Sequence, residues 1–125
     1  MRAVWVFVAG GIGSVARYGV ALACSSAFGV AFPFGTLAVN LVGSFLLAVL
    51  VELAVAEHVS PELRVTLGTG FIGGFTTYSA FNQEAFALLR DGALGAGAGY
   101  IALTLAGCLA MGLFGQLAAR AYLAG

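Results

Sequence analysis

The distribution of charge constrains this chain most strongly, because five basic and five acidic side chains leave long uncharged stretches between them. A helix needs about 20 mostly apolar residues to cross a hydrocarbon core about 30 Å thick, and the longer stretches provide them. Charged residues make up 8% of the chain and hydrophobic residues 62%, against about 25% and about 45–50% in soluble domains. The composition therefore predicts a membrane protein. The uncharged stretches are residues 3–16, 18–51, 65–83 and 92–119.

Proline and charge positions divide these stretches into four expected helices. The stretch 18–51 is too long for one span, and Phe32-Pro33-Phe34-Gly35 divides it. Proline has no amide hydrogen and pushes the residue before it away from helical geometry. We therefore expect an all-α membrane protein, with residues 1–125 forming one domain. Its spans are expected at about 3–24, 35–55, 65–90 and 96–119.

Four spans would put both termini and the connection 56–64 on one side of the membrane. The positive-inside rule then gives only a weak orientation bias. A chain that inserts both ways can form an antiparallel two-fold dimer, and four short helices alone enclose little space. We therefore expect a dual-topology homodimer surrounded by membrane lipid. The arginines would be Arg2, Arg64 and Arg120 on the first side, with Arg90 and Arg17 on the second.

Glycine interrupts the third expected span. A glycine costs about 1 kcal/mol relative to alanine inside a helix, so the adjacent pair Gly73-Gly74 predicts a break there. A break in a membrane frees carbonyls and amides, which are tolerated only inside protein or along a polar cavity. Opposed half-helix ends are also ready ion sites. A merely kinked and packed helix is the alternative, and the glycines of the first and last spans are expected to serve close packing.

Polar and aromatic side chains recur at helical spacing on three of the spans. Such a lane of hydroxyl and amide groups can carry a small ion by replacing its water with fixed partners. Aromatic ring edges carry the positive end of the ring quadrupole and favour an anion, although an aromatic stripe is also a common packing device. The expected faces are Thr36, Asn40 and Ser44; Tyr78, Phe81 and Glu84; and Tyr100, Thr104 and Cys108.

Several classes of function are not supported by the residues. The net charge is zero and no lysine is present, so no basic stripe is available for nucleic acid. No Ser-His-Asp set, paired intramembrane carboxylates or phosphate loop is present, so we expect no enzyme. Cys24 and Cys108 lie in apolar stretches, where a thiol behaves as a small hydrophobe. Glu52, Glu57 and His58 are expected to be solvated, and a lone histidine makes no metal site.

Three long motifs, in order along the chain, resemble the signatures of the bacterial fluoride channels called Fluc or CrcB. The resemblance implies an antiparallel dual-topology homodimer in the cell membrane with two fluoride pores. Such a channel exports fluoride passively and so lowers cytoplasmic fluoride and its toxicity. The motifs are Gly10-Gly-Ile-Gly-Ser-Val-Ala-Arg17-Tyr18, Gly35-Thr-Leu-Ala-Val-Asn40-Leu-Val-Gly-Ser-Phe45 and Gly70-Phe-Ile-Gly-Gly-Phe-Thr-Thr-Tyr-Ser-Ala-Phe81.

The resemblance also implies roles for single residues. Asn40 would face the pore, and Tyr78 and Phe81 would form an aromatic box. The main-chain carbonyls of Gly73 and Thr76, from both subunits, would hold a structural sodium ion, since four carbonyl oxygens suit a hard cation. The remaining polar residues of the pore would be Thr77, Ser79, Glu84, Tyr100, Thr104 and Cys108, with Arg17 in a structural role.

Two positions depart from the family pattern. Tyr78 stands where phenylalanine is common, so its hydroxyl adds a donor or a barrier. Cys108 stands where a hydroxyl is expected, and a thiol is a weaker donor.

Two alternatives remain open at this point. A small multidrug or cation exporter also works as an antiparallel dimer, but it needs a carboxylate buried in the first span. Residues 3–24 contain no Asp or Glu. A non-transporting accessory subunit would explain the glycines, but it would not explain three polar faces.

Overall fold

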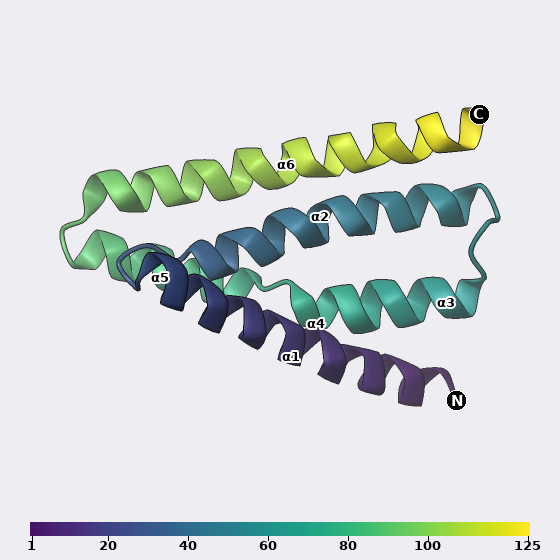
Figure 1. Cartoon of the computed structure of the whole chain (residues 1–125), viewed down its shortest axis with the longest axis horizontal. Coiled ribbons are helices and arrows are strands. Elements are labelled where there is room, and N and C mark those ends of the chain that lie inside the picture. The colour runs from purple at the N-terminus through teal and green to yellow at the C-terminus, as the bar shows by residue number, and fades with distance from the viewer.

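The computed structural model describes all of residues 1–125, and it is helical throughout apart from short connections (Figure 1). The connections cover residues 29–33, 56–60, 76–77 and 91–93. In chain order the elements are α1 (Arg2–Phe28), α2 (Phe34–Val55), α3 (Pro61–Val65), the π-helix η1 (Thr66–Ile72), α4 (Gly73–Phe75), α5 (Tyr78–Arg90) and α6 (Leu94–Ala124).

Three of the helices, α1, α2 and α6, are long and apolar enough to cross a membrane. At about 1.5 Å per residue, even the shortest of them, α2, runs about 33 Å, which exceeds a hydrocarbon core of about 30 Å. The protein is therefore a multi-pass membrane protein. The third expected span is divided into α3, η1, α4 and α5, and the longest of these pieces has 13 residues.

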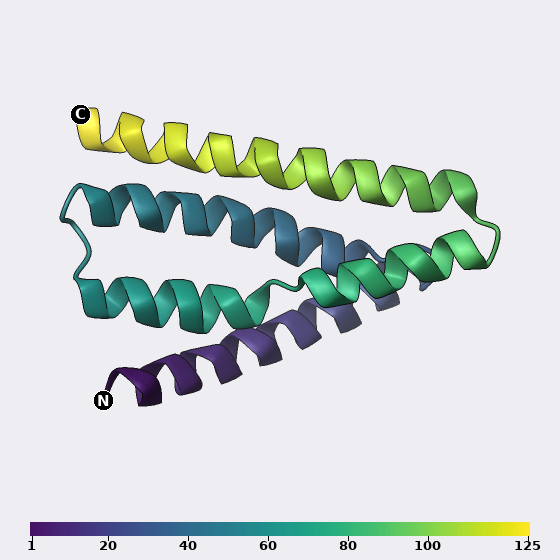
Figure 2. The same ribbon diagram turned by 180° about the vertical axis from the view of Figure 1, so that it is seen from behind.

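Both termini and the connection 56–60 lie at one end of the molecule, as expected from the sequence (Figures 1 and 2). The connections 29–33 and 91–93 lie at the opposite end. Helix α6 runs alongside α2, and α1 crosses the broken segment at η1 and α4. This arrangement brings the break of the third segment to the middle of the bundle.

Glycines allow α1 to approach the broken segment at backbone distance. A Cβ atom added at Gly13 would overlap the carbonyl oxygen of Phe71, and one added at Gly74 would overlap the carbonyl oxygen of Gly10. One added at Gly70 would lie 3.0 Å from the carbonyl oxygen of Val6. The packing role expected for the glycines of the first span is therefore confirmed at Gly13, whereas a Cβ atom at Gly10 would make only ordinary contacts and one at Gly11 would meet no neighbouring atom.

The break itself lies beyond the glycine pair. Gly73 keeps helical angles, with φ −61° and ψ −36°. The backbone becomes extended at Thr76 (φ −88°, ψ 157°) and Thr77 (φ −154°, ψ 115°). The break expected near the centre of the third span is therefore confirmed, but the extended residues follow the pair Gly73-Gly74, because Gly74 serves the contact with α1 and side chains stabilise Thr76 and Thr77 in the extended form.

Ion pairs join elements at the end that carries the termini. Arg2 pairs with Glu62. The pKa of the Glu62 carboxyl is lowered, chiefly by a hydrogen bond from its own main-chain amide and next by the hydrogen bond from the Arg2 guanidinium. Arg120 donates to both carboxylate oxygens of Glu52, at 3.0 and 2.9 Å, and the side chain of Glu52 is 15% exposed. The expectation that Glu52 is solvated was therefore wrong. Its partner Arg120 lies on α6, far away in the sequence, so the pairing could not be read from the residues around Glu52.

Candidate functional site

The side chain of Asn40 on α2 holds the break of the third segment in its extended form. The amide of Thr77 donates to Asn40 Oδ1 at 2.8 Å, and Asn40 Nδ2 donates to the carbonyl of Thr77 at 3.0 Å. Both residues are buried, at 8% exposure. Hydrogen bonds in such a low-dielectric setting are strong, and losing one partner is costly. A carboxamide has two N–H donors and two acceptor lone pairs, so Asn40 retains one of each for another partner.

This arrangement frees two main-chain carbonyls at the break. In a continuous α-helix the amide of Thr77 would bond the carbonyl of Gly73, and the amide of Ala80 would bond that of Thr76. Here the amide of Thr77 donates to Asn40, and the amide of Ala80 donates to Thr77 Oγ1 at 3.2 Å. The carbonyls of Gly73 and Thr76 have therefore lost their helical donors. Gly73 is exposed on the surface of the chain.

A cavity of about 410 Å³, here called the Asn40 cavity, lies beside the break between α2, α5 and α6. Its lining combines aliphatic and aromatic side chains with amide, hydroxyl and thiol groups, and none of the lining residues carries a charge. Seven of the predicted site residues line it. They are Asn40, Thr76, Thr77, Tyr78, Phe81, Thr104 and Cys108, joined by Ser44 of the same α2 face.

The hydroxyl of Thr104 is the one polar side-chain group of this cavity that is buried without a partner. Thr104 is 5% exposed, and its Oγ1 makes no hydrogen bond in the chain. Leaving a buried hydroxyl unsatisfied costs about 1–3 kcal/mol, so native proteins seldom do so without a reason. Thr104 lines the Asn40 cavity, but its Oγ1 has almost no surface that water can reach in the chain.

The two expected aromatic residues differ in where they point. Phe81 is 5% exposed, and its ring centroid lies 5.3 Å from that of Tyr100. Tyr78 lines the same cavity with its ring centroid 5.5 Å from that of Phe81, but it is 73% exposed. The prediction that Tyr78, Phe81 and Glu84 share one face therefore holds for Phe81 and Glu84, while Tyr78 projects outward from the start of α5.

The carboxylate of Glu84 accepts hydrogen bonds from two hydroxyl groups. Thr36 Oγ1 donates to one carboxylate oxygen at 2.8 Å, and the hydroxyl of Tyr100 donates to the other at 2.7 Å. Thr36 and Glu84 line a second cavity of about 230 Å³ near the connection 29–33. Tyr100 is fully buried between the two cavities, since its ring packs on Phe81 and its hydroxyl reaches Glu84. In a single chain, the residues of the predicted polar lane therefore line two separate cavities.

The remaining predicted residues lie outside the Asn40 cavity. Ser79 is exposed, and its hydroxyl lies 3.2 Å from that of Thr77. Arg17 is half-buried in α1 and forms no ion pair within the chain. Gly43 was missed by the sequence analysis, although its position three residues after Asn40 on the same face indicates it. A Cβ atom there would overlap the side-chain methyl of Thr76, so Gly43 makes room for the break.

The chain matches known proteins over nearly its whole length. The family described as "CrcB-like protein, Camphor Resistance (CrcB)" matches residues 4–116. A protein of Sorangium cellulosum (strain So ce56) named fluoride-specific ion channel FluC is 48% identical over 97% of this chain and 96% of its own. Proteins of the same name from Anaeromyxobacter dehalogenans (strain 2CP-1) and Gloeobacter violaceus are 46% and 48% identical. These matches cover 99% and 96% of this chain, and 98% and 97% of theirs.

Proposed function

This chain belongs to the CrcB family, and from that membership we propose that it is a fluoride-specific ion channel of the cell membrane, like the relatives that carry this name. It lets fluoride leave the cell passively, which lowers cytoplasmic fluoride and its toxicity. Fluoride enters as its neutral acid and is trapped as the anion at the higher internal pH, so a passive anion pathway is sufficient. The protein is a channel and not an enzyme, as its relatives' names indicate.

The observation that carries the proposal is the unpartnered hydroxyl of Thr104 beside an uncharged cavity whose apolar lining includes a few donor groups. Fluoride sheds its water only where fixed donors replace it. The Asn40 cavity offers the second N–H of Asn40, the hydroxyl of Thr104, the thiol of Cys108 and the ring edge of Phe81. None of the lining residues is basic, so a fixed cation does not trap the anion there.

Residues beyond the Asn40 cavity extend the proposed pathway. The hydroxyls of Thr77 and Ser79 lie at the break, and the pair Tyr100 and Glu84 leads toward the second cavity. Tyr100 fills the space between the two cavities, so movement of its hydroxyl between Glu84 and the anion would be part of conduction. We assign Arg17 a structural role at the boundary with a second copy, because it has no ion-pair partner in its own chain.

The working unit is proposed to be an antiparallel homodimer of chains inserted in both orientations. One face of α5 supports this proposal, because Tyr78, Asn82 and Phe86 are exposed one turn apart. An amide and a tyrosine hydroxyl facing lipid would lack partners, whereas a second copy would satisfy them. Labelling of a terminal tag from both sides of intact cells tests the orientation. One-sided labelling of a functional protein would exclude dual topology.

A sodium ion is proposed to join the two copies through the carbonyls of Gly73 and Thr76. The residues fit such an ion, since both carbonyls have lost their helical donors and carbonyl oxygens are the ligands that a hard cation prefers. A bound cation would supply positive charge where the two breaks meet. Replacing sodium by N-methyl-D-glucamine should lower the melting temperature of the dimer. An unchanged melting temperature in the sodium-free protein would remove the ion from the proposal.

Growth of a fluoride-sensitive bacterial strain that lacks its own exporter tests the function in cells. Expression of this chain should restore growth in fluoride, while an equally expressed Asn40→Asp variant should not. A cation exporter is disfavoured because α1, Arg2–Phe28, contains no carboxylate to exchange protons. Proton-coupled uptake of a lipophilic cation, without fluoride resistance, would favour that alternative. A stoichiometric partner and no transport by the chain alone would favour the accessory subunit.

A further inference from the structure

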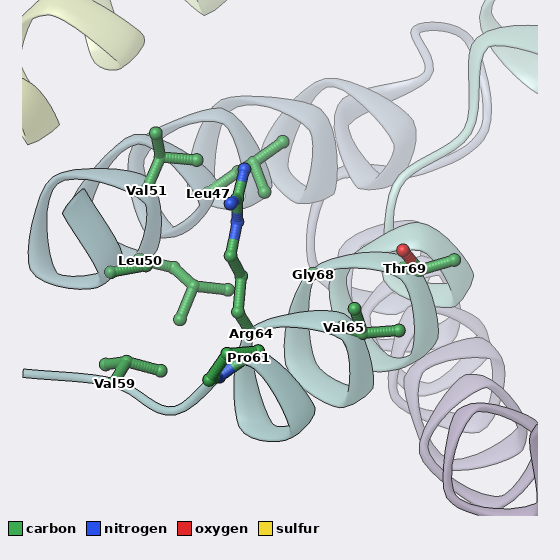
Figure 3. Close-up of a pocket in the computed structure, with 10 residues that line it drawn as sticks. Leu47, Leu50, Val51, Val59, Pro61, Arg64, Val65, Gly68 and Thr69 are labelled. Atoms are coloured by element: carbon green, nitrogen blue, oxygen red, sulfur yellow. The ribbon is translucent and has the colours of Figure 1, made fainter. Parts of the chain in front are cut away.

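A third cavity lies between the C-terminal half of α2 and the start of the broken segment, apart from the Asn40 cavity and the cavity lined by Thr36 and Glu84. It has a volume of about 470 Å³ and is here called the Arg64 cavity. Leu47, Leu50 and Val51 of α2 form one wall, and Gly68 and Thr69 of η1 form part of the other. Figure 3 shows the side chain of Arg64 extending from α3 across this space toward Leu47 and Leu50.

Arg64 is the only charged residue that lines this cavity, and it has no acidic partner. The other arginines at the ends of the helices are paired: Arg2 with Glu62, Arg90 with Asp91 and Arg120 with Glu52. No Asp or Glu lines the Arg64 cavity. A positive charge beside apolar walls focuses its field into the space in front of it and raises the local concentration of anions.

The Arg64 cavity and the Asn40 cavity share a residue. Leu47 lines both cavities, and Asn40, Ser44, Leu47 and Val51 follow one another along one face of α2. Leu47 lies two helical turns, about 10 Å, from Asn40. The two cavities therefore adjoin at Leu47, and the Arg64 cavity lies on the side of the Asn40 cavity that faces the chain termini (Figure 1).

We propose that the Arg64 cavity is the entrance of the fluoride pathway at this end, where Arg64 concentrates the anion before it loses its water. This inference rests on the proposed channel function. Arg64 acts here as an electrostatic guide in a wide aqueous space and not as a ligand inside the narrow pathway. Its effect must therefore weaken when salt screens its charge, in contrast to the effect of Asn40, Phe81 or Thr104.

The experiment compares initial fluoride efflux from uncharged phosphatidylcholine vesicles that hold wild-type, Arg64→Gln, Arg64→Lys or Arg64→Glu protein. Each is measured at about 0.01 M and about 1 M potassium gluconate, where the screening length is about 30 Å and about 3 Å. At low salt, Arg64→Gln should slow efflux roughly threefold to tenfold, and Arg64→Glu more, while Arg64→Lys should match the wild type. At high salt the wild type and Arg64→Gln should converge.

Arg90→Gln is the matched control, because it removes one positive charge from an exposed pair that lines neither the Arg64 cavity nor the Asn40 cavity. It should leave efflux at the wild-type rate in both salts. Equal efflux by Arg64→Gln and the wild type at low salt would overturn the inference. An equal reduction at both salts would also overturn it, since it would show a packing role. Absence of fluoride efflux from the wild type would instead refute the proposed function before any variant is compared.

Discussion

Replacement of Asn40 by aspartate separates two roles of this side chain, which are support of the break through Thr77 and lining of the proposed fluoride pathway. The change keeps the size of the side chain and keeps an oxygen that accepts from the amide of Thr77. It removes the N–H that donates to the carbonyl of Thr77 at 3.0 Å. A buried carbonyl without a donor costs about 1–3 kcal/mol, which is small against a typical folding stability of about 5–15 kcal/mol. The variant should therefore still fold and form dimers.

The effect on an anion requires the ionised carboxyl, whose desolvation at this buried position adds to the stability change. An ionised carboxylate about 4 Å from the path of fluoride repels it by about 4 kcal/mol at an effective dielectric constant of about 20. At about 1.4 kcal/mol per factor of ten, this lowers conduction roughly a thousandfold. This loss of conduction is measured as fluoride efflux from vesicles at alkaline pH, where the carboxyl is ionised. Size-exclusion chromatography and thermal melting of the same preparation measure the fold.

Two further variants complete this test. Asn40→Ala removes both bonds to Thr77 and should cost about 2–6 kcal/mol, at about 1–3 kcal/mol for each buried group left unpaired. Ser44→Ala removes a hydroxyl one turn away that donates to the carbonyl of Asn40 at 2.7 Å, and it adds no charge. Its conduction should stay within a few-fold of the wild type. Wild-type conduction by Asn40→Asp would remove Asn40 from the pathway, and wild-type stability of Asn40→Ala would refute its support of the break.

Three other changes are predicted to act in different ways. Phe81→Ile removes a polarised ring edge worth about 0.5–1.5 kcal/mol and should slow fluoride efflux up to about tenfold, whereas unchanged efflux would leave Phe81 a packing residue only. Thr104→Val keeps the shape of the side chain and removes an unpartnered hydroxyl, so thermal melting should show equal or higher stability. Fluoride efflux should fall in this variant, and unaltered efflux would mean that the hydroxyl meets no ion. Gly74→Ala overlaps the carbonyl of Gly10 and should lower stability by about 1–3 kcal/mol in thermal melting. Gly112→Ala, which meets no neighbouring atom in the chain, is its control and should melt like the wild type.

The sequence predicted the helices well, because length and the absence of charge decide which segments can lie in a membrane. The helix expected at 35–55 is observed at Phe34–Val55. Periodicity also placed Thr104 and Cys108 on one face of α6, since residues one turn apart share a face wherever the helix is regular, and both residues line the Asn40 cavity. These features depend on local order, which the sequence displays directly.

Features that depend on distant partners were not predictable in the same way. The break was expected at Gly73-Gly74 because glycine weakens helices, but the extended residues are Thr76 and Thr77, which Asn40 stabilises from another helix. The outward position of Tyr78 follows from where α5 begins, and the start of α5 depends on the two hydrogen bonds between Asn40 and Thr77. The pairing of Glu52 with Arg120 likewise depends on how α2 and α6 pack.

Fluoride efflux from liposomes that hold the purified protein, read with a fluoride electrode beside a chloride measurement, tests the central claim most directly. We expect rapid release of fluoride without release of chloride, because the uncharged Asn40 cavity replaces the water of a small anion through a few fixed donors. Release of neither ion by a folded dimer, or equal release of both, would contradict the assignment of this chain as a fluoride-specific channel.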